Sequence, residues 1–252
     1  MKIVIAKNAG YCFGVRDAVN LAYDIASKEG KVYMLGDIVH NENVVNDLNT
    51  AGATVVNSLD DIPKDSTVLF RAHGTKNEVW DEASRRSLNI KDATCPLVYQ
   101  IHSDVKELHA EGRKIIVIGD HGHDEVVAIA DKAPNTIVIS TPKEAIELKK
   151  IKKAGIVSQS TQAIENVQEI ISILMTKIFD LRFVNTICYP TKRNQEQIKD
   201  LAVIVDVMII IGSFTSANSK RLASLSTELN KNTYQVSDES EINKEWFIDC
   251  SS

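Results

Sequence analysis

Short apolar runs alternate along the chain with polar turns and with segments of helical periodicity. The runs are KIVIA, KVYML, TVLFRA, LNIKDA, KIIVIGD, AGIVS, LRFVN and VMIIIG. After the first run, Val15, Ala18, Val19, Ala22 and Ile25 fall on one face of a helix. This alternation predicts an α/β protein in which helices cover parallel sheets. Periodicity alone leaves a single (β/α)₈ barrel open as the alternative.

Composition and charge indicate a globular protein and argue against nucleic-acid binding, a membrane span and secretion. With 252 residues, of which 44% are hydrophobic, the chain can bury a large core. The net charge of -5 argues against a nucleic-acid partner. The longest apolar stretch, 201–211, is too short for a membrane span and contains Asp206. The N-terminus lacks the pattern of a secretory signal, so we expect a cytoplasmic protein without disulfides.

Three cysteines that lie far apart in sequence share one setting. Cys12 in AGYCFGV, Cys95 in DATCPLV and Cys188 in NTICYPT each stand between a strand-like run and a helix. None belongs to a CxxC pair, so a metal site requires three distant strand ends to converge. Three thiolates would suit an iron–sulfur cubane in which one iron is left open to substrate. A zinc site made of cysteine and histidine ligands is the alternative. Cys250 lacks this setting and is interpreted as incidental.

Hydrogen-bonding side chains follow the other predicted strands. They are His40 with Asn41, His73 with Gly74, His123 with Glu125, Ser160 with Thr161, and Ser216 with Asn218. Ligands of parallel α/β proteins bind beyond the carboxyl ends of strands, and donors beside helix N-termini suit a phosphate or diphosphate. Glu125 shares its turn with a histidine and is the candidate proton donor. His102, His109 and His121 lack this pattern and receive no role, and the chain has neither GxGxxG nor GxxxxGK[ST].

Taken in order, these motifs resemble those of a known enzyme family. AGYCFGV, GDIVHN, FRAHGT, DATCPLV, GHDE, SQST, and CYPT with Asn194 and Gln195 are similar to the motifs of 4-hydroxy-3-methylbut-2-enyl diphosphate reductase, the LytB family. The resemblance implies three α/β lobes with pseudo-threefold symmetry around a central iron–sulfur cluster, and so favours this fold over the barrel. The expected lobes are 13–95, 96–187, and a shortened third lobe made of 1–12 with 188–252.

The resemblance also implies a reaction and a set of site residues. Cys12, Cys95 and Cys188 match the ligands of a [4Fe-4S] cluster, and Glu125 matches the residue that delivers protons. The residues matching substrate-binding positions are His40, His73, His123, Ser160, Thr191, Ser216 and Asn218. The enzyme removes the allylic hydroxyl of its diphosphate substrate and releases isopentenyl and dimethylallyl diphosphate. Ferredoxin or flavodoxin supplies electrons in the family, which requires no nicotinamide pocket.

Some positions depart from the family pattern. Ser160 stands where threonine is usual, Ala217 replaces one serine of an SSN triplet, and Asn194 takes the place of an arginine. The family also continues beyond the last residue of this sequence into a segment with another diphosphate-binding serine. We expect cluster binding to persist and substrate affinity to fall, unless Ser213 or Thr215 replaces the lost contacts. A non-catalytic iron–sulfur redox module of the same fold is the alternative function, and a zinc hydrolase is a third.

Overall fold

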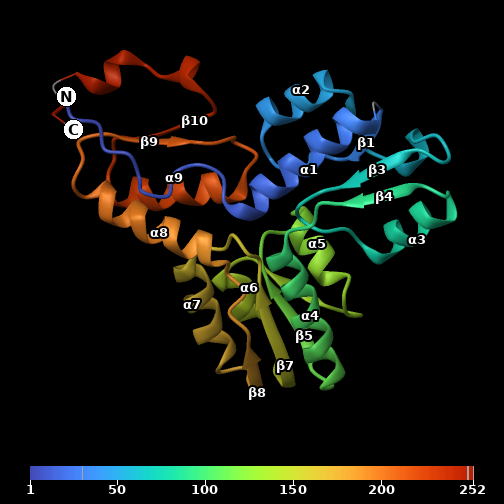
Figure 1. The fold of residues 1–252 in the computed structure, drawn as a ribbon. Coiled ribbons are helices and arrows are strands. Elements are labelled where there is room, and N and C mark those ends of the chain that lie inside the picture. The colour runs from blue at the N-terminus through green and yellow to red at the C-terminus, as the bar shows by residue number, and fades with distance from the viewer. Residues whose placement is uncertain (30, 249, 252) are drawn as a thin grey trace. The chain divides into compact units, whose positions relative to one another are not determined.

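A computed structural model describes residues 1–29, 31–248 and 250–251, and the chain divides into two compact units (Figure 1). The major unit comprises Cys12–Val39 and Asn43–Ile187. The minor unit combines Met1–Tyr11, His40–Glu42 and Cys188–Ser252. The strands form three separate parallel sheets, two in the major unit and one in the minor unit.

The first sheet of the major unit has the strand order β2-β1-β3-β4, with all neighbours parallel. Its strands are β1 (Val32–Leu35), β2 (Ala53–Val56), β3 (Thr67–Phe70) and β4 (Asn89–Asp92). Its helices are α1 (Phe13–Glu29), α2 (Glu42–Thr50), α3 (Asn77–Arg85) and the 3₁₀ helix η1 (Leu59–Asp61). Val32 pairs with Ala53 on one side and with Thr67 on the other, which places β1 inside the sheet.

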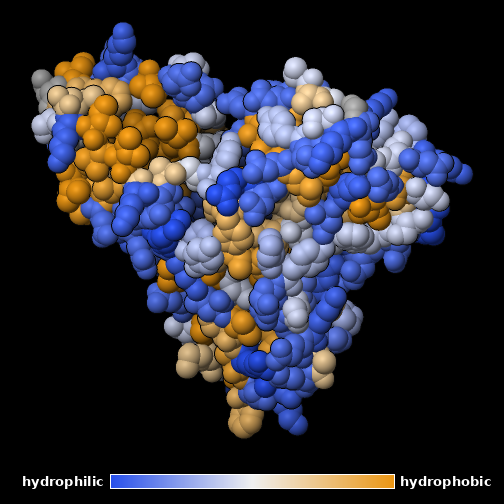
Figure 2. Space-filling view, in the orientation of Figure 1, coloured by the Kyte–Doolittle hydropathy of each residue, from blue (hydrophilic) through white to orange (hydrophobic). Residues whose placement is uncertain are grey.

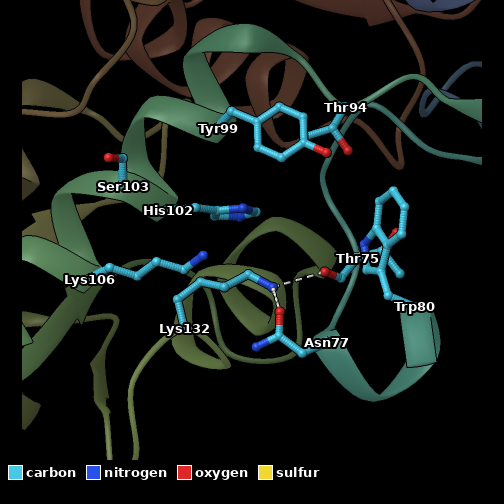
Figure 3. Close-up of a pocket in the computed structure, with 9 residues that line it drawn as sticks. All are labelled: Thr75, Asn77, Trp80, Thr94, Tyr99, His102, Ser103, Lys106 and Lys132. Carbon is cyan, nitrogen blue, oxygen red and sulfur yellow. Dashed lines mark hydrogen bonds between the residues drawn. The ribbon is translucent and has the colours of Figure 1, made fainter.

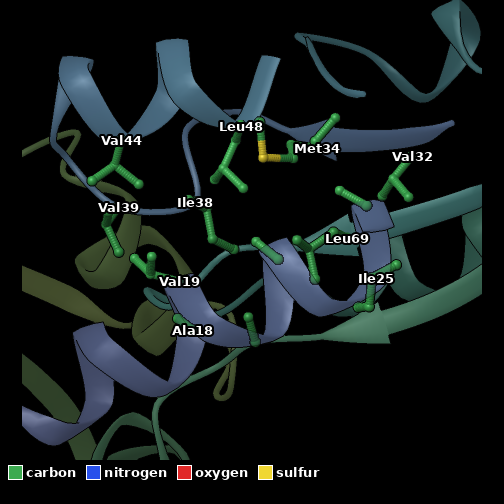
Figure 4. Close-up of a cluster of buried hydrophobic side chains, with 14 of the residues drawn as sticks. Ala18, Val19, Ile25, Val32, Met34, Ile38, Val39, Val44, Leu48 and Leu69 are labelled. Atoms are coloured by element: carbon green, nitrogen blue, oxygen red, sulfur yellow. The ribbon is translucent and has the colours of Figure 1, made fainter. Parts of the chain in front are cut away.

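The predicted apolar face of α1 forms part of this core. Ala18, Val19, Ala22 and Ile25 are buried, and Figure 4 shows the helix packed beside Val32, Met34 and Leu69 of the sheet and Leu48 of α2, among others. Burying one face of a helix removes apolar area from water and supplies most of the helix's stability. The helical periodicity predicted for this segment is confirmed.

The second sheet of the major unit has the order β6-β5-β7-β8, again with all neighbours parallel. Its strands are β5 (Lys114–Ile118), β6 (Ile137–Ile139), β7 (Ile151–Ser158) and β8 (Ile178–Phe183), and its helices are α4 (Pro96–Ala110), α5 (Asp124–Ala130), α6 (Pro142–Glu147) and α7 (Ile164–Leu174). Ile116 and Ile118 join the core cluster that includes residues of α6 and α7, whereas Ile115 and Val117 join the cluster of α4 and α5. Because strand side chains alternate between faces, an almost wholly apolar strand indicates helices on both sides.

Two phenylalanines of the major unit provide a matched test of core packing. Phe70 is 0% exposed and its ring meets Trp80 edge to face at 4.8 Å, whereas Phe179 is 91% exposed. We expect Phe70→Ala to lower the free energy of unfolding by about 3–5 kcal/mol. Phe179→Ala should change it by less than about 0.5 kcal/mol. Urea denaturation followed by circular dichroism measures both, and equal effects would contradict the assigned core.

The minor unit contains the third sheet. Its parallel strands are β9 (Met208–Ile211) and β10 (Thr233–Val236), and its helices are α8 (Tyr189–Ala202), α9 (Ala217–Leu229), η2 (Glu239–Glu241) and η3 (Lys244–Phe247). Ile198 of α8, Met208 and Ile210 of β9 and Leu225 of α9 form its apolar cluster. This core is smaller than those of the major unit.

The strand predicted for KIVIA is wrong. Residues 2–6 have no regular secondary structure, and none of the ladders formed by the described residues includes them. The amide of Lys2 donates to the carbonyl of Ser251, while Ile3 and Ile5 remain largely exposed. A strand exists only through pairing with a neighbour. Figure 2 shows the resulting apolar surface where this segment and β9 lie in Figure 1.

The other seven predicted runs are confirmed as strands, and each falls in β1, β3, β4, β5, β7, β8 or β9. The barrel alternative is excluded, because the described strands form three open parallel sheets instead of one closed sheet. Each sheet lies within one of the three expected lobes, whose boundaries and pseudo-threefold symmetry stay a prediction. Among the helices that the structure describes, none is both long and apolar enough to cross a membrane.

Candidate functional site

Two of the predicted cluster ligands stand at the starts of helices in the major unit. Cys95 is the N-cap of α4, followed by Pro96, and Cys12 directly precedes α1. A Cβ atom on Gly14 would lie 2.5 Å from Sγ of Cys95, so the thiol packs against the first turn of α1. Burial raises the pKa of the Cys95 thiol, and the charge of Cys12 acts in the same direction. The fold therefore brings these two cysteines into one environment.

The close approach of Gly14 to Cys95 predicts a specific steric effect. In Gly14→Ala, the new methyl group would overlap Sγ, and we expect the free energy of unfolding to fall by about 1–3 kcal/mol. In a Cys95→Ala background the nearest remaining side-chain atom is Cβ at 3.3 Å. The same glycine substitution should then cost at least about 1 kcal/mol less. Chemical denaturation of the four proteins in this cycle measures the difference, and additive effects would contradict the contact.

Glu125 lies in the first turn of α5 and is buried, with 2% of its surface exposed. Its two carboxylate oxygens accept hydrogen bonds from Ser160, one from the backbone amide at 2.5 Å and one from the hydroxyl at 2.8 Å. A buried carboxylate requires such donors, because an unsatisfied charge is costly inside a protein. The segments that follow β5 and β7 contain Glu125 and Ser160, respectively. They meet at one edge of the sheet, as predicted for parallel strands.

His123 and His73 lie near the start of α5 in the major unit. His123 is the N-cap of α5, and its Nδ1 accepts a hydrogen bond from the amide of Glu125 at 3.2 Å. Because Nδ1 is the acceptor, the neutral ring carries its proton on Nε2 and can donate from there. The rings of His73 and His123 meet edge to face at 5.6 Å. Two predicted substrate-binding histidines therefore form a pair.

An ion pair near these histidines was absent from the sequence prediction. Arg71 lies between β3 and His73, and its Nη1 is 2.5 Å from the carboxylate of Asp124, which precedes Glu125. Both side chains are partly buried, so the pair is shielded from solvent more than a surface ion pair is. It connects the turn that carries His73 to the start of α5. The FRAHGT and GHDE motifs contain these residues, but sequence spacing gave no signal that they pair.

Other predicted site residues belong to the minor unit. Cys188 is the N-cap of α8, and its Sγ lies 3.1 Å from the hydroxyl oxygen of Thr191, a buried residue of the first turn. Ser216 is the N-cap of α9, and its hydroxyl accepts a hydrogen bond from the amide of Ser219. Asn218 lies in the first turn of the same helix. Each of these side chains therefore stands at a helix N-terminus, where donors and the helix dipole favour an anion.

The hydroxyl groups of Ser213 and Thr215 are hydrogen-bonded to the carboxylate of Glu42. The Ser213 hydroxyl donates to Glu42 at 2.8 Å and that of Thr215 donates at 3.2 Å. The Ser213 bond lowers the pKa of Glu42, Thr215 contributes less, and the charge of His40 contributes least. An ionised Glu42 repels a diphosphate, so these two hydroxyls are poor candidates for diphosphate binding.

A family profile described as LytB protein matches residues 3–252. The chain belongs to the LytB family. A LytB relative from Geobacter metallireducens, named 4-hydroxy-3-methylbut-2-enyl diphosphate reductase, is 41% identical over 248 residues, which cover 98% of this chain and 88% of the relative. A relative of the same name from Geotalea uraniireducens is 40% identical with the same coverage.

Solved structures agree with membership of the LytB family. The E-1-hydroxy-2-methyl-but-2-enyl-4-diphosphate reductase from Plasmodium falciparum matches with a TM-score of 0.93 at 26% identity, covering 97% of this chain and 79% of that chain. A second structure is titled (E)-4-hydroxy-3-methyl-but-2-enyl diphosphate reductase, the terminal enzyme of the non-mevalonate pathway. It matches with a TM-score of 0.71 at 37% identity, covering 98% and 90%. The α/β fold with parallel sheets is therefore that of LytB proteins.

Proposed function

We propose that this protein reduces 4-hydroxy-3-methylbut-2-enyl diphosphate to isopentenyl and dimethylallyl diphosphate, the last step of the non-mevalonate isoprenoid pathway. The carbon–oxygen bond to the allylic hydroxyl breaks, two electrons and two protons enter, and the hydroxyl leaves as water. The relatives that carry this activity in their names cover 98% of the chain. The observation that carries the proposal is the buried Glu125 carboxylate, which accepts from Ser160 and stands two residues after His123, whose ring meets that of His73.

Proteins of the LytB family are iron–sulfur proteins. The residues of this chain fit such a group, because Cys12, Cys95 and Cys188 are thiols outside any disulfide of the described residues, each partly buried and each at the start of a helix. These three cysteines are proposed to hold a [4Fe-4S] cluster, which supplies the electrons to the substrate when bound.

Substrate recognition is assigned to side chains of both units by their motif positions. In the major unit, His73 and His123 line the substrate pocket and Ser160 orients the substrate hydroxyl. In the minor unit, His40 is a further pocket histidine, and Thr191, Ser216 and Asn218 bind the diphosphate. These last three residues lie in the first turns of α8 and α9 or at a helix cap. Helix N-termini suit a diphosphate because their free amides point toward the anion.

Proton delivery is assigned to Glu125. Ser160 donates two hydrogen bonds to the carboxylate, which fixes both oxygens in place. The hydroxyl of Ser160 can also donate and accept in turn, so it can pass a proton between Glu125 and the leaving hydroxyl. A fixed acid beside the leaving group removes the cost of orienting it during the reaction. Ferredoxin or flavodoxin is the proposed electron donor.

The test begins with anaerobic purification and analysis of iron, sulfide and zinc. We expect about four irons and four sulfides per chain, as a cubane requires. The substrate is then supplied with a chemically reduced one-electron donor, and both five-carbon diphosphates are measured by mass spectrometry. Stoichiometric zinc without sulfide would contradict the iron–sulfur assignment. A loaded cluster without product formation would support the non-catalytic redox module instead.

A further inference from the structure

A pocket lies in the major unit, and none of the residues that line it is among those assigned to the reaction. Its volume is about 380 Å³, and Figure 3 shows its lining side chains. The lining comes from the start of α3, from α4 and from the residue that follows α5, and consists of Thr75, Asn77, Trp80, Thr94, Tyr99, His102, Ser103, Lys106 and Lys132. Pockets of this size bind small organic molecules.

The inner wall of the pocket contains a buried histidine. His102 is 5% exposed, and its Nε2 has no hydrogen-bond partner among the residues that the structure describes. In Figure 3 its ring lies between Tyr99 and Lys132 and points toward the middle of the drawn side chains. A Cβ atom on Gly74 would lie 2.9 Å from its Cε1, so the ring also packs against the turn that carries His73. The same Cβ position would lie 3.2 Å from Nε2, so this nitrogen lies against the Gly74 turn and the ring of His102 forms the inner wall of the pocket.

Two lysines give the pocket its charge. The side chain of Lys132 is 5% exposed and donates to the Thr75 carbonyl at 3.1 Å and to Asn77 Oδ1 at 2.8 Å, with Asp131 at 3.4 Å. Lys132 is therefore satisfied by the protein. Lys106 is exposed, and within the described part of the chain none of the ion pairs includes it. Its charge raises the electrostatic cost of the buried Lys132 ammonium, and a bound anion would offset that repulsion.

The donors and the aromatic walls together indicate the ligand. His102, Ser103 and Lys106 occupy one side of α4, at positions that share a helix face. A phosphate group presents several terminal oxygens and can accept from the Lys106 ammonium and the Ser103 hydroxyl. Trp80 and Tyr99 add flat apolar surface, and Tyr99 directs its hydroxyl to Asp92. We propose that this pocket binds a phosphorylated small molecule, with Lys106 and Ser103 on the phosphate, the ring of His102 in the wall beside it, and Trp80 and Tyr99 against an aromatic or apolar body.

The proposal predicts that an anion changes the protonation of His102. Burial lowers the pKa of His102 to about 4, and the charges of Lys132 and Lys106 act in the same direction. Asp131 and Asp92 also face the ring and oppose this shift more weakly. A phosphate beside the ring favours its charged form, so binding should raise the pKa of His102.

Histidine-selective NMR on the protein as purified provides the test, with adenosine 5′-monophosphate and inorganic phosphate as probes at constant ionic strength. The His102→Gln spectrum identifies the resonance of His102. We expect a saturable shift of that resonance, tighter for the nucleotide than for phosphate, and an increase in the pKa of His102. Adenosine without phosphate should bind at least about tenfold more weakly than the nucleotide, since charge-assisted hydrogen bonds are lost.

Lys106→Met should weaken nucleotide binding about tenfold or more, whereas Lys143→Met, at an exposed lysine outside the pocket, should leave it unchanged. The resonances of the other five histidines report whether each variant is folded. A His102 resonance that responds to neither probe would overturn the proposal, as would equal binding by Lys106→Met and the unsubstituted protein. Because the readout needs no turnover, it stands or fails independently of the reductase assignment.

Discussion

Replacing Cys95 by serine is expected to abolish iron–sulfur cluster binding and reductase turnover together while the fold is retained. A serine hydroxyl is a weak substitute for thiolate, the usual ligand of such clusters. The side chain of Cys95 makes no capping hydrogen bond in α4, and serine is a preferred residue at that N-cap position. Helix stability should therefore not fall. Iron and sulfide analysis, the visible absorption spectrum and far-ultraviolet circular dichroism measure the two effects separately.

Cys250 provides the matched control for this substitution. Its Sγ lies near the carbonyl oxygens of Trp246 and Ile248, at 3.5 Å and 3.7 Å. Sequence context assigned it no metal-binding role. Cys250→Ser should therefore keep its full content of iron and sulfide and near-normal turnover. Loss of iron in this variant, or full retention of iron in Cys95→Ser, would be incompatible with the proposed ligand set.

Replacing Glu125 by glutamine should slow turnover by about 10²–10⁴-fold, the range expected when a general acid is removed. The amide has the same shape as the carboxylate, and its oxygen can still accept from the Ser160 amide. Its NH₂ group can donate to the Ser160 hydroxyl, which then acts as the acceptor instead of the donor. The buried site thus stays satisfied, and the expected loss is chemical. Steady-state kinetics should show kcat falling while KM changes little.

Two control variants separate proton delivery by Glu125 from a structural role. Glu169→Gln, at an exposed position of α7, controls for the loss of one negative charge and should keep normal kcat. Ser160→Ala removes one donor to Glu125 and leaves the carboxylate in place, so its effect on kcat should be smaller than that of Glu125→Gln. If Glu125→Gln turned over at the normal rate with a normal cluster, Glu125 would not be the proton donor.

The hydrophobic pattern predicted the interior of each sheet better than its edges. The strands that the pattern missed, β2, β6 and β10, are all edge strands. Each is only four residues long or shorter and buries few of its side chains, so its apolar signal is weak. The error at residues 2–6 has the opposite cause. That run is apolar, but a strand depends on a partner that local sequence does not specify.

The candidate site shows a similar division. The turns that carry His123, Cys95 and Cys188 could be located because each follows a strand and begins a helix, and that of Ser160 because it follows β7. Their pairwise contacts could not be predicted, because Glu125 and Ser160 are 35 positions apart and meet only through the parallel pairing of β5 and β7. His102 received no role because it does not follow a predicted strand as His40, His73 and His123 do. Its importance depends on burial, which periodicity does not reveal.

The minor unit is assembled from three separate stretches of chain, and this has a consequence for protein synthesis. The amide of Asn8 bonds to the side chain of Gln197, a contact that spans 189 positions. Residues 1–11 therefore leave the ribosome long before their partners in α8 have been made. Closing so large a loop is entropically costly and slows folding. The last residue of the major unit is Ile187, so this unit can fold first. Cys12 and Cys95 are then already positioned when Cys188 is synthesised.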